Sequence, residues 1–263
     1  MMRSLLSLLL FTLTLQNYPC LQSGEISRKQ YLDLIQSYPQ LASYPGNYTK
    51  GEIQIVLDPH EMASIENNLG RDVGLIQRDK YWLWINDACI FPNGTQGIYG
   101  RIVWVNTLEA RSGVAVMPVT KEGKIILNCN FRHATRSWEI ELPRGGVNSG
   151  EDVESAAKRE TMEETGMIVS DLVLLGEIPP DTGLTGTVVP IFLAKVTETL
   201  APEREDSEAI EENLALSLTE IKQAFLQGFY EHCIRGVKQK VSFRDPFLAY
   251  AILMYELKQH IVE

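Results

Sequence analysis

The chain has 263 residues, which is enough for one large domain or for a domain with an extension. Its 44% apolar and 22% charged residues are ordinary for a globular protein, and its four cysteines lie far apart, which excludes a disulfide-dense scaffold or a zinc finger. The net charge of −10 argues against general nucleic-acid binding but is compatible with a nucleotide substrate, because bound metal ions reverse the local field.

The amino terminus has the parts of a secretory signal. Arg3 precedes an apolar run over residues 4–15, and a polar boundary follows at residues 16–19. The run is too short for an ordinary membrane span. We expect residues 1–24 to be a signal peptide or an apolar N-terminal segment, with export in the first case and a cytoplasmic protein in the second. A helix that docks on the domain, or a start codon set too far upstream, would give the same pattern.

Residues 25–79 form an N-terminal extension to which the sequence assigns no chemistry. A helix is predicted around Ser27–Ser37, Gly- and Pro-marked turns follow at residues 44–46, and a second apolar-periodic piece covers Pro59–Asn68.

From residue 80 the pattern changes to short strands. The predicted strands cover residues 82–85, 99–105, 112–118, 125–131 and 138–142, and the pair Asn93-Gly94 is a strong hairpin signal. Further strands are predicted at residues 172–178 and 188–196, followed by an acidic loop at 201–213 and a helix at 217–228. A last helix starts with Asp245 as N-cap and Pro246 as first residue. Its expected buried stripe is Phe247, Tyr250, Leu253, Met254 and Leu257. This order predicts a mixed α/β fold.

The helix predicted over residues 152–165 carries the most informative side chains. Ser149 or Asn148 is expected to cap its start and Gly166 to follow its end. Glu160, Glu163 and Glu164 are spaced i, i+3 and i+4, so they share one face near the negative end of the helix dipole. A fold tolerates such crowding when cations bind, and carboxylate oxygens suit Mg²⁺ or Mn²⁺.

The segment from Gly145 to Met167, GGVNSGEDVESAAKRETMEETGM, resembles the signature of the Nudix hydrolases. The matching positions include Gly145, Glu151, Arg159 and Gly166 beside the three glutamates, and the departure is Thr161, where the family usually has an aliphatic residue. The resemblance implies an α/β/α Nudix sandwich with a mixed sheet over residues 80–263. Residues around Phe131-Arg132 and Glu139–Gly145 are similar to the ADP-ribose pyrophosphatase branch of that family.

By this resemblance, Glu160, Glu163 and Glu164 are the metal ligands, together with the backbone carbonyl of Arg144. Arg159 is expected to hold the carboxylates in place, because metal ligands need orienting partners. Glu163 also counts among the candidate catalytic residues. Without the family pattern, a solvated acidic helix face would explain these residues as well.

The general base of the ADP-ribose branch comes from an acidic loop after the sheet. Glu205 and Glu208 are therefore our candidates for the base, although charge runs often only face water. Arg132, Glu141 and Gly183 are the candidate substrate-binding residues, and ordinary ion pairing on the strand surface is the alternative for the two charged residues. Trp138 has the chemistry to stack on a base, but a tryptophan within a strand is more often part of the core.

The expected function is Mg²⁺-dependent (or Mn²⁺-dependent) hydrolysis of the diphosphate linkage of a nucleoside diphosphate derivative. ADP-ribose or a nucleotide sugar is the expected substrate, and the family resemblance suggests a homodimer. One alternative is another Nudix substrate, such as NADH, a dinucleoside polyphosphate or a nucleoside triphosphate. The other is a non-catalytic module that senses ADP-ribose, against which the intact set of glutamates argues.

Overall fold

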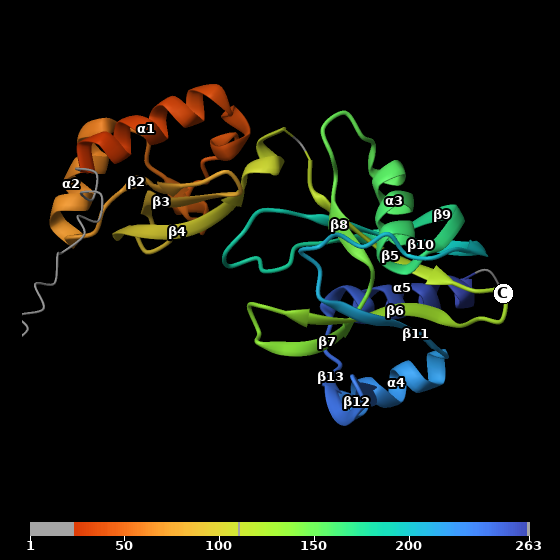
Figure 1. The fold of residues 1–263 in the computed structure, drawn as a ribbon. Coiled ribbons are helices and arrows are strands. Elements are labelled where there is room, and N and C mark those ends of the chain that lie inside the picture. The colour runs from red at the N-terminus through yellow and green to blue at the C-terminus, as the bar shows by residue number, and fades with distance from the viewer. Residues whose placement is uncertain (1–23, 110, 262–263) are drawn as a thin grey trace, which may run out of the picture. The chain divides into compact units, whose positions relative to one another are not determined.

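The computed structural model describes residues 24–109 and 111–261 (Figure 1). The predicted signal peptide therefore lies outside the described residues, except for its last position. No helix in the described part of the chain is long and apolar enough to cross a membrane. The chain divides into two compact units. One comprises the described residues up to Ile76 together with Asn86–Tyr99, and the other comprises Gln77–Ile85 together with the residues from Gly100 onward.

The first unit packs two helices around a small apolar core. The helix predicted around Ser27–Ser37 is confirmed as α1 (Gly24–Ser37), and the apolar-periodic piece at Pro59–Asn68 forms the helix α2 (Pro59–Leu69). Asp58 caps α2 by accepting hydrogen bonds from two backbone N–H groups of its first turn. Tyr31, Met62 and Ile65 are fully buried. The other elements of this part are the short helices η1 (Pro39–Ala42) and η2 (Tyr48–Lys50) and the strands β1 (Gln54–Ile55) and β2 (Gly74–Arg78).

A long hairpin contributes residues to both units. Its strands are β3 (Trp82–Ile90) and β4 (Gln96–Trp104), and β3 also pairs with β1 and β2. The predicted turn at Asn93-Gly94 is confirmed, with Gly94 in the left-handed region at a φ of 81°. The helix η3 (Val105–Glu109) follows β4.

The second unit is built on a sheet of nine strands, which confirms the predicted mixed sheet. Its main strand order is β12-β13-β7-β6-β5-β10-β9, while β11 pairs with β6 and β8 pairs with β5. Strand β10 runs parallel to β5 and β13 parallel to β7, and the other pairs are antiparallel. The strands are β5 (Gly113–Val119), β6 (Ile125–Arg132), β7 (Ser137–Glu141), β8 (Arg144–Gly146), β9 (Met167–Ile178), β10 (Val189–Thr199), β11 (Ile210–Leu216), β12 (Phe229–Ile234) and β13 (Val237–Ser242).

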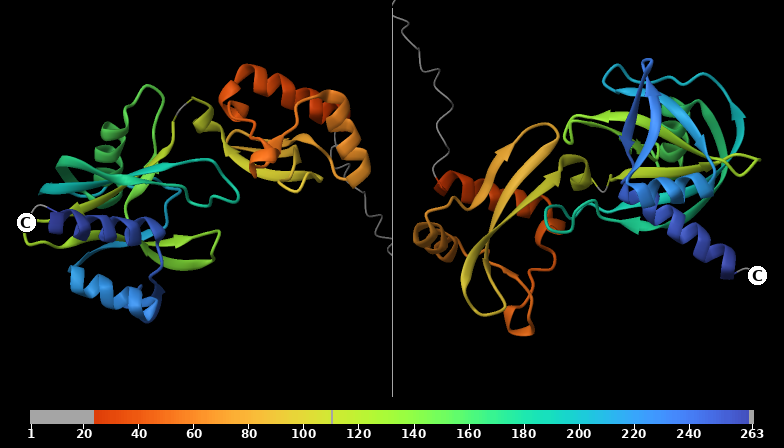
Figure 2. Two further views of the ribbon diagram at one scale, coloured as in Figure 1. Left: turned by 180° about the vertical axis from the view of Figure 1, so that it is seen from behind. Right: turned by 90° about the horizontal axis from the view of Figure 1, so that it is seen from below.

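Alternation along β5 separates two apolar layers and confirms the α/β/α sandwich. Val114 and Val116 pack with residues of α3 (Val153–Thr165), whereas Ala115 and Met117 pack with residues of α4 (Leu218–Gln227) and α5 (Pro246–Ile261). Successive side chains of a strand point to opposite faces, so one strand serves both layers. The views of Figure 2 show α3 and α5 on opposite sides of this sheet.

Two predicted boundaries were wrong for local reasons. The cap of α3 is Asp152, whose carboxylate accepts the N–H of Ser155 at 2.8 Å, and not Ser149 or Asn148. The acidic segment 201–213 is not a loop throughout, because β11 begins at residue 210. Its partner strand β6 satisfies the backbone groups of this polar strand, and the apolar pattern does not reveal that pairing.

The predicted buried stripe of α5 was also partly wrong. Leu253 and Leu257 are exposed, and the buried positions are Phe247, Leu248, Ala251 and Ile252. The helix is apolar on more than one side, so hydrophobic spacing alone does not identify the face that meets the sheet. Its predicted start is confirmed, with Asp245 accepting hydrogen bonds from the N–H groups of Phe247 and Leu248.

The end of α3 yields a stability test. Gly166 ends the helix at a φ of 71°, and a Cβ there would lie 2.2 Å from the carbonyl oxygen of Leu200. Gly228 ends α4 at a φ of 74° with open space around it. We expect Gly228→Ala to lower the free energy of unfolding by about 1 kcal/mol, from backbone strain alone. Gly166→Ala should cost roughly 2–4 kcal/mol, because it adds a steric clash. Urea unfolding measures both, and equal losses would contradict the close approach.

Candidate active site

Three carboxylates converge at the C-terminal half of α3. One carboxylate oxygen from each of Glu160, Glu164 and Glu208 lies within 4.8 Å of the others. Glu160 and Glu164 are buried on α3, and the half-buried Glu208 reaches them from the segment that precedes β11. The structure therefore brings together two of the expected metal ligands and one of the two expected bases. We call this group the acid cluster.

Glu163 points to a different partner. Its carboxylate accepts a hydrogen bond from Arg159 at 2.9 Å, and the same guanidinium donates to Glu160 at 2.8 Å. Arg159 also pairs with both oxygens of Glu151 at 2.9 Å and donates to the carbonyl of Gly146 at 2.8 Å. One arginine thus ties together the helix, the preceding loop and β8, as expected for a residue that orients the ligands.

Burial dominates the electrostatics of the cluster. Desolvation raises the pKa of Glu164 to about 8, and the nearby charge of Glu208 adds to this shift. Desolvation also raises the pKa of Glu160, although Arg159 opposes the shift. Glu164 receives its hydrogen bonds from neutral donors, the side chain of Asn128 at 2.7 Å and the backbone N–H of Arg144 at 2.9 Å. These dipoles orient the carboxyl group of Glu164 but bring no positive charge to it.

The backbone of β8 runs directly beside the acid cluster. A Cβ on Gly145 would lie 2.1 Å from the carboxyl carbon of Glu160, so only glycine leaves room for that side chain. The adjacent peptide of Arg144 donates to Glu164, which places the residue expected to supply a carbonyl ligand next to the cluster. This close approach explains why the glycine must stand at this point of the sequence.

The donor set fits a hard divalent cation. The cluster offers carboxylate oxygens alone, in a partly buried setting where desolvation, and then the nearby charge of Glu208, raise the pKa of Glu164. A bound cation would offset the negative charge, and oxygen ligands on a rigid element suit Mg²⁺ or Mn²⁺. Glu160 and Glu164 are the residues placed to hold it, and the carboxylate of Glu208 lies beside them.

The second candidate base lies apart from the cluster. Glu205 is exposed, and its carboxylate accepts a hydrogen bond from the Ser207 hydroxyl at 3.2 Å. The carboxylate of Glu208 accepts the N–H of Glu205 at 3.3 Å, so the two glutamates belong to one tight turn. Only Glu208 of this pair reaches the acids of α3.

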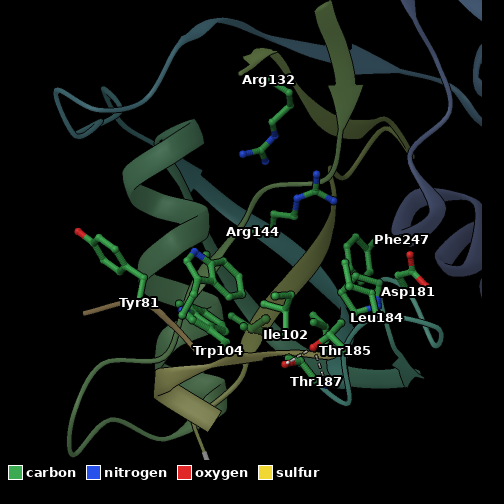
Figure 3. Close-up of a pocket in the computed structure, with 17 residues that line it drawn as sticks. Tyr81, Ile102, Trp104, Arg132, Arg144, Asp181, Leu184, Thr185, Thr187 and Phe247 are labelled. Atoms are coloured by element: carbon green, nitrogen blue, oxygen red, sulfur yellow. Dashed lines mark hydrogen bonds between the residues drawn. The ribbon is translucent and has the colours of Figure 1, made fainter. Parts of the chain in front are cut away.

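A pocket of about 900 Å³ lies within the second unit on the other side of β8 (Figure 3). Arg144, Gly145 and Gly146 of β8 line it. Its aromatic wall contains Trp82 and Trp104, whose rings stack with their centroids 6.2 Å apart. Figure 3 shows Arg132 and Arg144 on one side and Trp104, Ile102 and Leu184 on the other. The remaining lining residues are Tyr81, Gly113, Val114, Pro180, Asp181, Thr185, Thr187, Val189 and Phe247.

Buried acidic side chains pair with the two arginines of the pocket. Glu141 is 2% exposed and pairs with both Arg132 and Arg144. Asp245 accepts a second hydrogen bond from Arg144 at 2.9 Å, and the guanidinium of Arg144 lies 5.0 Å from the ring centroid of Phe247. Arg132 is therefore placed where a ligand in the pocket would meet it, whereas Glu141 lies beneath the arginines and orients them.

The remaining predicted residues lie at the margin or in the core. Gly183 is exposed, in a turn whose neighbours Asp181 and Leu184 line the pocket. Trp138 packs edge-on against Phe131 at 5.5 Å and joins the main core, which confirms its expected role. Sequence reasoning missed Trp82 and Trp104, although both were in or next to predicted strands. A tryptophan within a strand is more often part of the core, so no signal in the sequence marked these two, and the exposure of Trp82 is known only from the structure.

The raised pKa of Glu164 gives a pH-dependent prediction. With rising pH the unfolded chain ionises this carboxyl near pH 4.5, while the folded protein resists ionisation up to about pH 8. Metal-free wild-type protein therefore loses stability over this range, and Glu164→Gln does not. We expect the stability difference between them to grow by roughly 1–3 kcal/mol from pH 5.5 to pH 8 in EDTA. Urea unfolding measures it, with the exposed Glu177→Gln as control, and a pH-independent difference would contradict it.

Comparison with known proteins places the site in a family. Residues 109–235 match the NUDIX domain family. An ADP-ribose pyrophosphatase of Bacillus subtilis is 31% identical over 147 residues, covering 56% of this chain and 72% of that protein. An ADP-ribose pyrophosphatase of Saccharomyces cerevisiae is 29% identical over 171 residues, covering 62% of this chain and 73% of that protein.

A solved structure shares the fold. An ADP compounds hydrolase aligns with a TM-score of 0.54 and 20% sequence identity, over 70% of this chain and 89% of that chain. The sequence signature, the acid cluster on α3 and the similarity to the bacterial relative agree. The chain belongs to the Nudix hydrolase family.

Proposed function

We propose that this Nudix hydrolase uses Mg²⁺ or Mn²⁺ to hydrolyse the diphosphate linkage of a nucleoside diphosphate derivative, with ADP-ribose or a nucleotide sugar as substrate. The observation that carries the proposal is that β8 borders both the acid cluster and the pocket with stacked indoles and arginines. The names of the two relatives, both ADP-ribose pyrophosphatases, support the choice of substrate.

The pocket has the chemistry that such a substrate requires. A nucleobase offers a flat π-face, and the indoles of Trp82 and Trp104 offer a matching apolar wall. The diphosphate is anionic, and Arg132 and Arg144 are oriented beside β8 by buried acids. Gly183, in the exposed turn beside the pocket, allows close backbone contact with the distal part of the substrate.

Glu160 and Glu164 are the principal metal ligands in this proposal, with Arg144 contributing its backbone carbonyl. Bound divalent ions would neutralise charge on the phosphoryl oxygens and lower the pKa of a water molecule. Glu163 assists by holding Arg159, which in turn fixes the carboxylate of Glu160. These contacts keep the ligands in one arrangement before the substrate enters.

Glu208 is the proposed general base. A water oxygen attacks one phosphorus atom while the bond from that phosphorus to the bridging oxygen breaks, and the water proton passes to the Glu208 carboxylate. The two products are then phosphorylated compounds, each carrying one of the original phosphorus atoms. Glu205 is the weaker candidate because its side chain is exposed and accepts a hydrogen bond from the Ser207 hydroxyl. Geometry therefore favours Glu208.

A substrate panel tests the function. The purified chain is incubated with Mg²⁺ or Mn²⁺ and with ADP-ribose, nucleotide sugars, NADH, diadenosine polyphosphates or nucleoside triphosphates, and product release is followed by chromatography. We expect ADP-ribose or a nucleotide sugar to be cleaved fastest, EDTA to stop the reaction, and Glu164→Gln to lose it while remaining folded. Turnover of triphosphates alone, or tight ADP-ribose binding without turnover, would overturn the proposal.

The aromatic wall gives a separate prediction. Removing a stacking partner of a base costs about 1–3 kcal/mol in binding, so we expect Trp82→Ala to raise KM for the preferred nucleotide about tenfold. Its kcat should change little, because stacking acts equally on bound substrate and transition state. Trp84, an exposed neighbour on the same strand that does not line the pocket, provides the matched control Trp84→Ala. Equal KM values for the two variants would show that the nucleobase does not stack on this aromatic wall.

Two other proposals come from the sequence and have their own tests. Light scattering of the purified chain measures whether it forms the homodimer that the family resemblance suggests. N-terminal sequencing of protein from the native host shows whether residues 1–24 are removed as a signal peptide. Cleavage there would indicate export, and an intact terminus would indicate a cytoplasmic protein.

A further inference from the structure

Arg204 stands in the acidic segment that carries Glu208, and its guanidinium is fully engaged by α3 and β11. Its Nε donates to the backbone carbonyl of Glu164 at 3.1 Å. Its other two nitrogens donate to the carbonyl of Ile210 at 3.0 Å and to the side-chain oxygen of Asn213 at 2.7 Å. The planar fork of one arginine therefore joins the end of α3 to the start of β11.

Two amides continue this connection to the acid cluster. The Nδ2 of Asn213 donates to the Oδ1 of Asn128 at 2.8 Å, and the Nδ2 of Asn128 donates to Oε2 of Glu164 at 2.7 Å. Each hydrogen bond in this series is donated in the direction from Arg204 toward Glu164, so each bond polarises the next. Because Asn213 occupies the oxygen of Asn128, the amide nitrogen of Asn128 must face the carboxylate. We call this chain the amide relay.

The same segment also closes the open end of α3. The N–H of Glu203 donates to the carbonyl of Glu163 at 2.9 Å, and the N–H of Leu200 donates to that of Gly166 at 2.7 Å. With Arg204 on the carbonyl of Glu164, two carbonyls in the last turn of the helix have partners from this segment, one of them cationic. Glu208 follows four residues after Arg204, so its approach to the acid cluster depends on this anchor.

The geometry points to Arg204 as a positioning residue with two effects. It anchors the segment that brings Glu208 to Glu160 and Glu164, and through the amide relay it fixes the orientation of the Glu164 carboxylate. The inference rests on the proposed function, because it assigns Arg204 to the same metal-dependent site. A lysine would supply the charge without the fork, so it would not satisfy the three acceptors together.

Binding of Mn²⁺ alone tests this without a substrate. Calorimetric titration of Arg204→Gln should show a dissociation constant for Mn²⁺ about 10–100-fold higher than wild type, the usual effect of losing a residue that orients metal ligands. The binding stoichiometry should stay unchanged, whereas a merely destabilised protein would lose stoichiometry instead. With the substrate found by the panel, kcat should fall by a similar factor while KM stays within about twofold. Arg204→Lys should recover part of the Mn²⁺ affinity.

The matched control is Arg235→Gln. The side chain of Arg235 is 80% exposed and pairs with Glu211. Glu211 lies on β11, as Asn213 does, but Arg235 does not contact the acid cluster. Wild-type values of Mn²⁺ affinity and kcat are expected for this variant.

Asn213→Asp separates the two effects and guards against misfolding of the arginine variant. The aspartate keeps an acceptor for Arg204 and so retains the contacts of the guanidinium, but it has no N–H to donate to Asn128 or to the carbonyl of Glu164, to which the Asn213 amide also donates at 3.2 Å. We expect a higher dissociation constant for Mn²⁺ here too. Wild-type Mn²⁺ affinity in both Arg204→Gln and Asn213→Asp would overturn the inference, and a change in the arginine variant alone would overturn the relay. If no compound of the substrate panel is cleaved but both variants bind Mn²⁺ more weakly than wild type, the proposed function is refuted and this inference stands.

Discussion

The site depends on concentrating negative charge where a helix least favours it. Glu160 and Glu164 are buried at the C-terminal half of α3, where the helix dipole is negative, and Glu208 joins them from another segment. Neighbouring groups stabilise the crowded carboxylates in two ways. Arg159 neutralises one side of the cluster through Glu160 and Glu163, whereas Glu164 receives only dipoles, from an amide side chain and a backbone N–H. The divalent cation of the proposed function would offset the remaining negative charge.

The fold supplies this arrangement with elements that have little chemistry of their own. Strand β5 packs α3 on one face and α4 and α5 on the other, and its edge pairs with β8. Since β8 is held by the sheet, its glycine backbone approaches α3 closely enough to contact the carboxylate of Glu160. The position of the acids is therefore determined by sheet pairing and by the absence of one side chain, as much as by the helix that carries them.

Much of this could be predicted from the sequence because it follows local rules. The i, i+3, i+4 spacing of the glutamates, the glycine after α3 and the proline that begins α5 all act within one or two turns of chain. The amide relay could not be predicted in this way, since Asn128 and Asn213 are 85 positions apart and meet only through the pairing of β6 with β11. Similarly, Glu163 shares a helical face with the other acids, yet its carboxylate pairs with Arg159, and Glu208 from a distant segment joins Glu160 and Glu164 instead. Spacing identifies which side chains can meet, and competition among partners decides which do.

The thinness of β8 has a consequence for any small molecule designed against this protein. A single extended main chain, without a side chain at Gly145, is the partition between the aromatic pocket and the carboxylates behind it. If the carboxylates bind divalent ions as proposed, a compound against the indoles would meet a different electrostatic field in the metal-loaded and metal-free protein, because one layer of peptide separates the two sites. Its apparent potency would then vary with chelators in the assay, so screening hits from metal-depleted and metal-loaded conditions would form different sets.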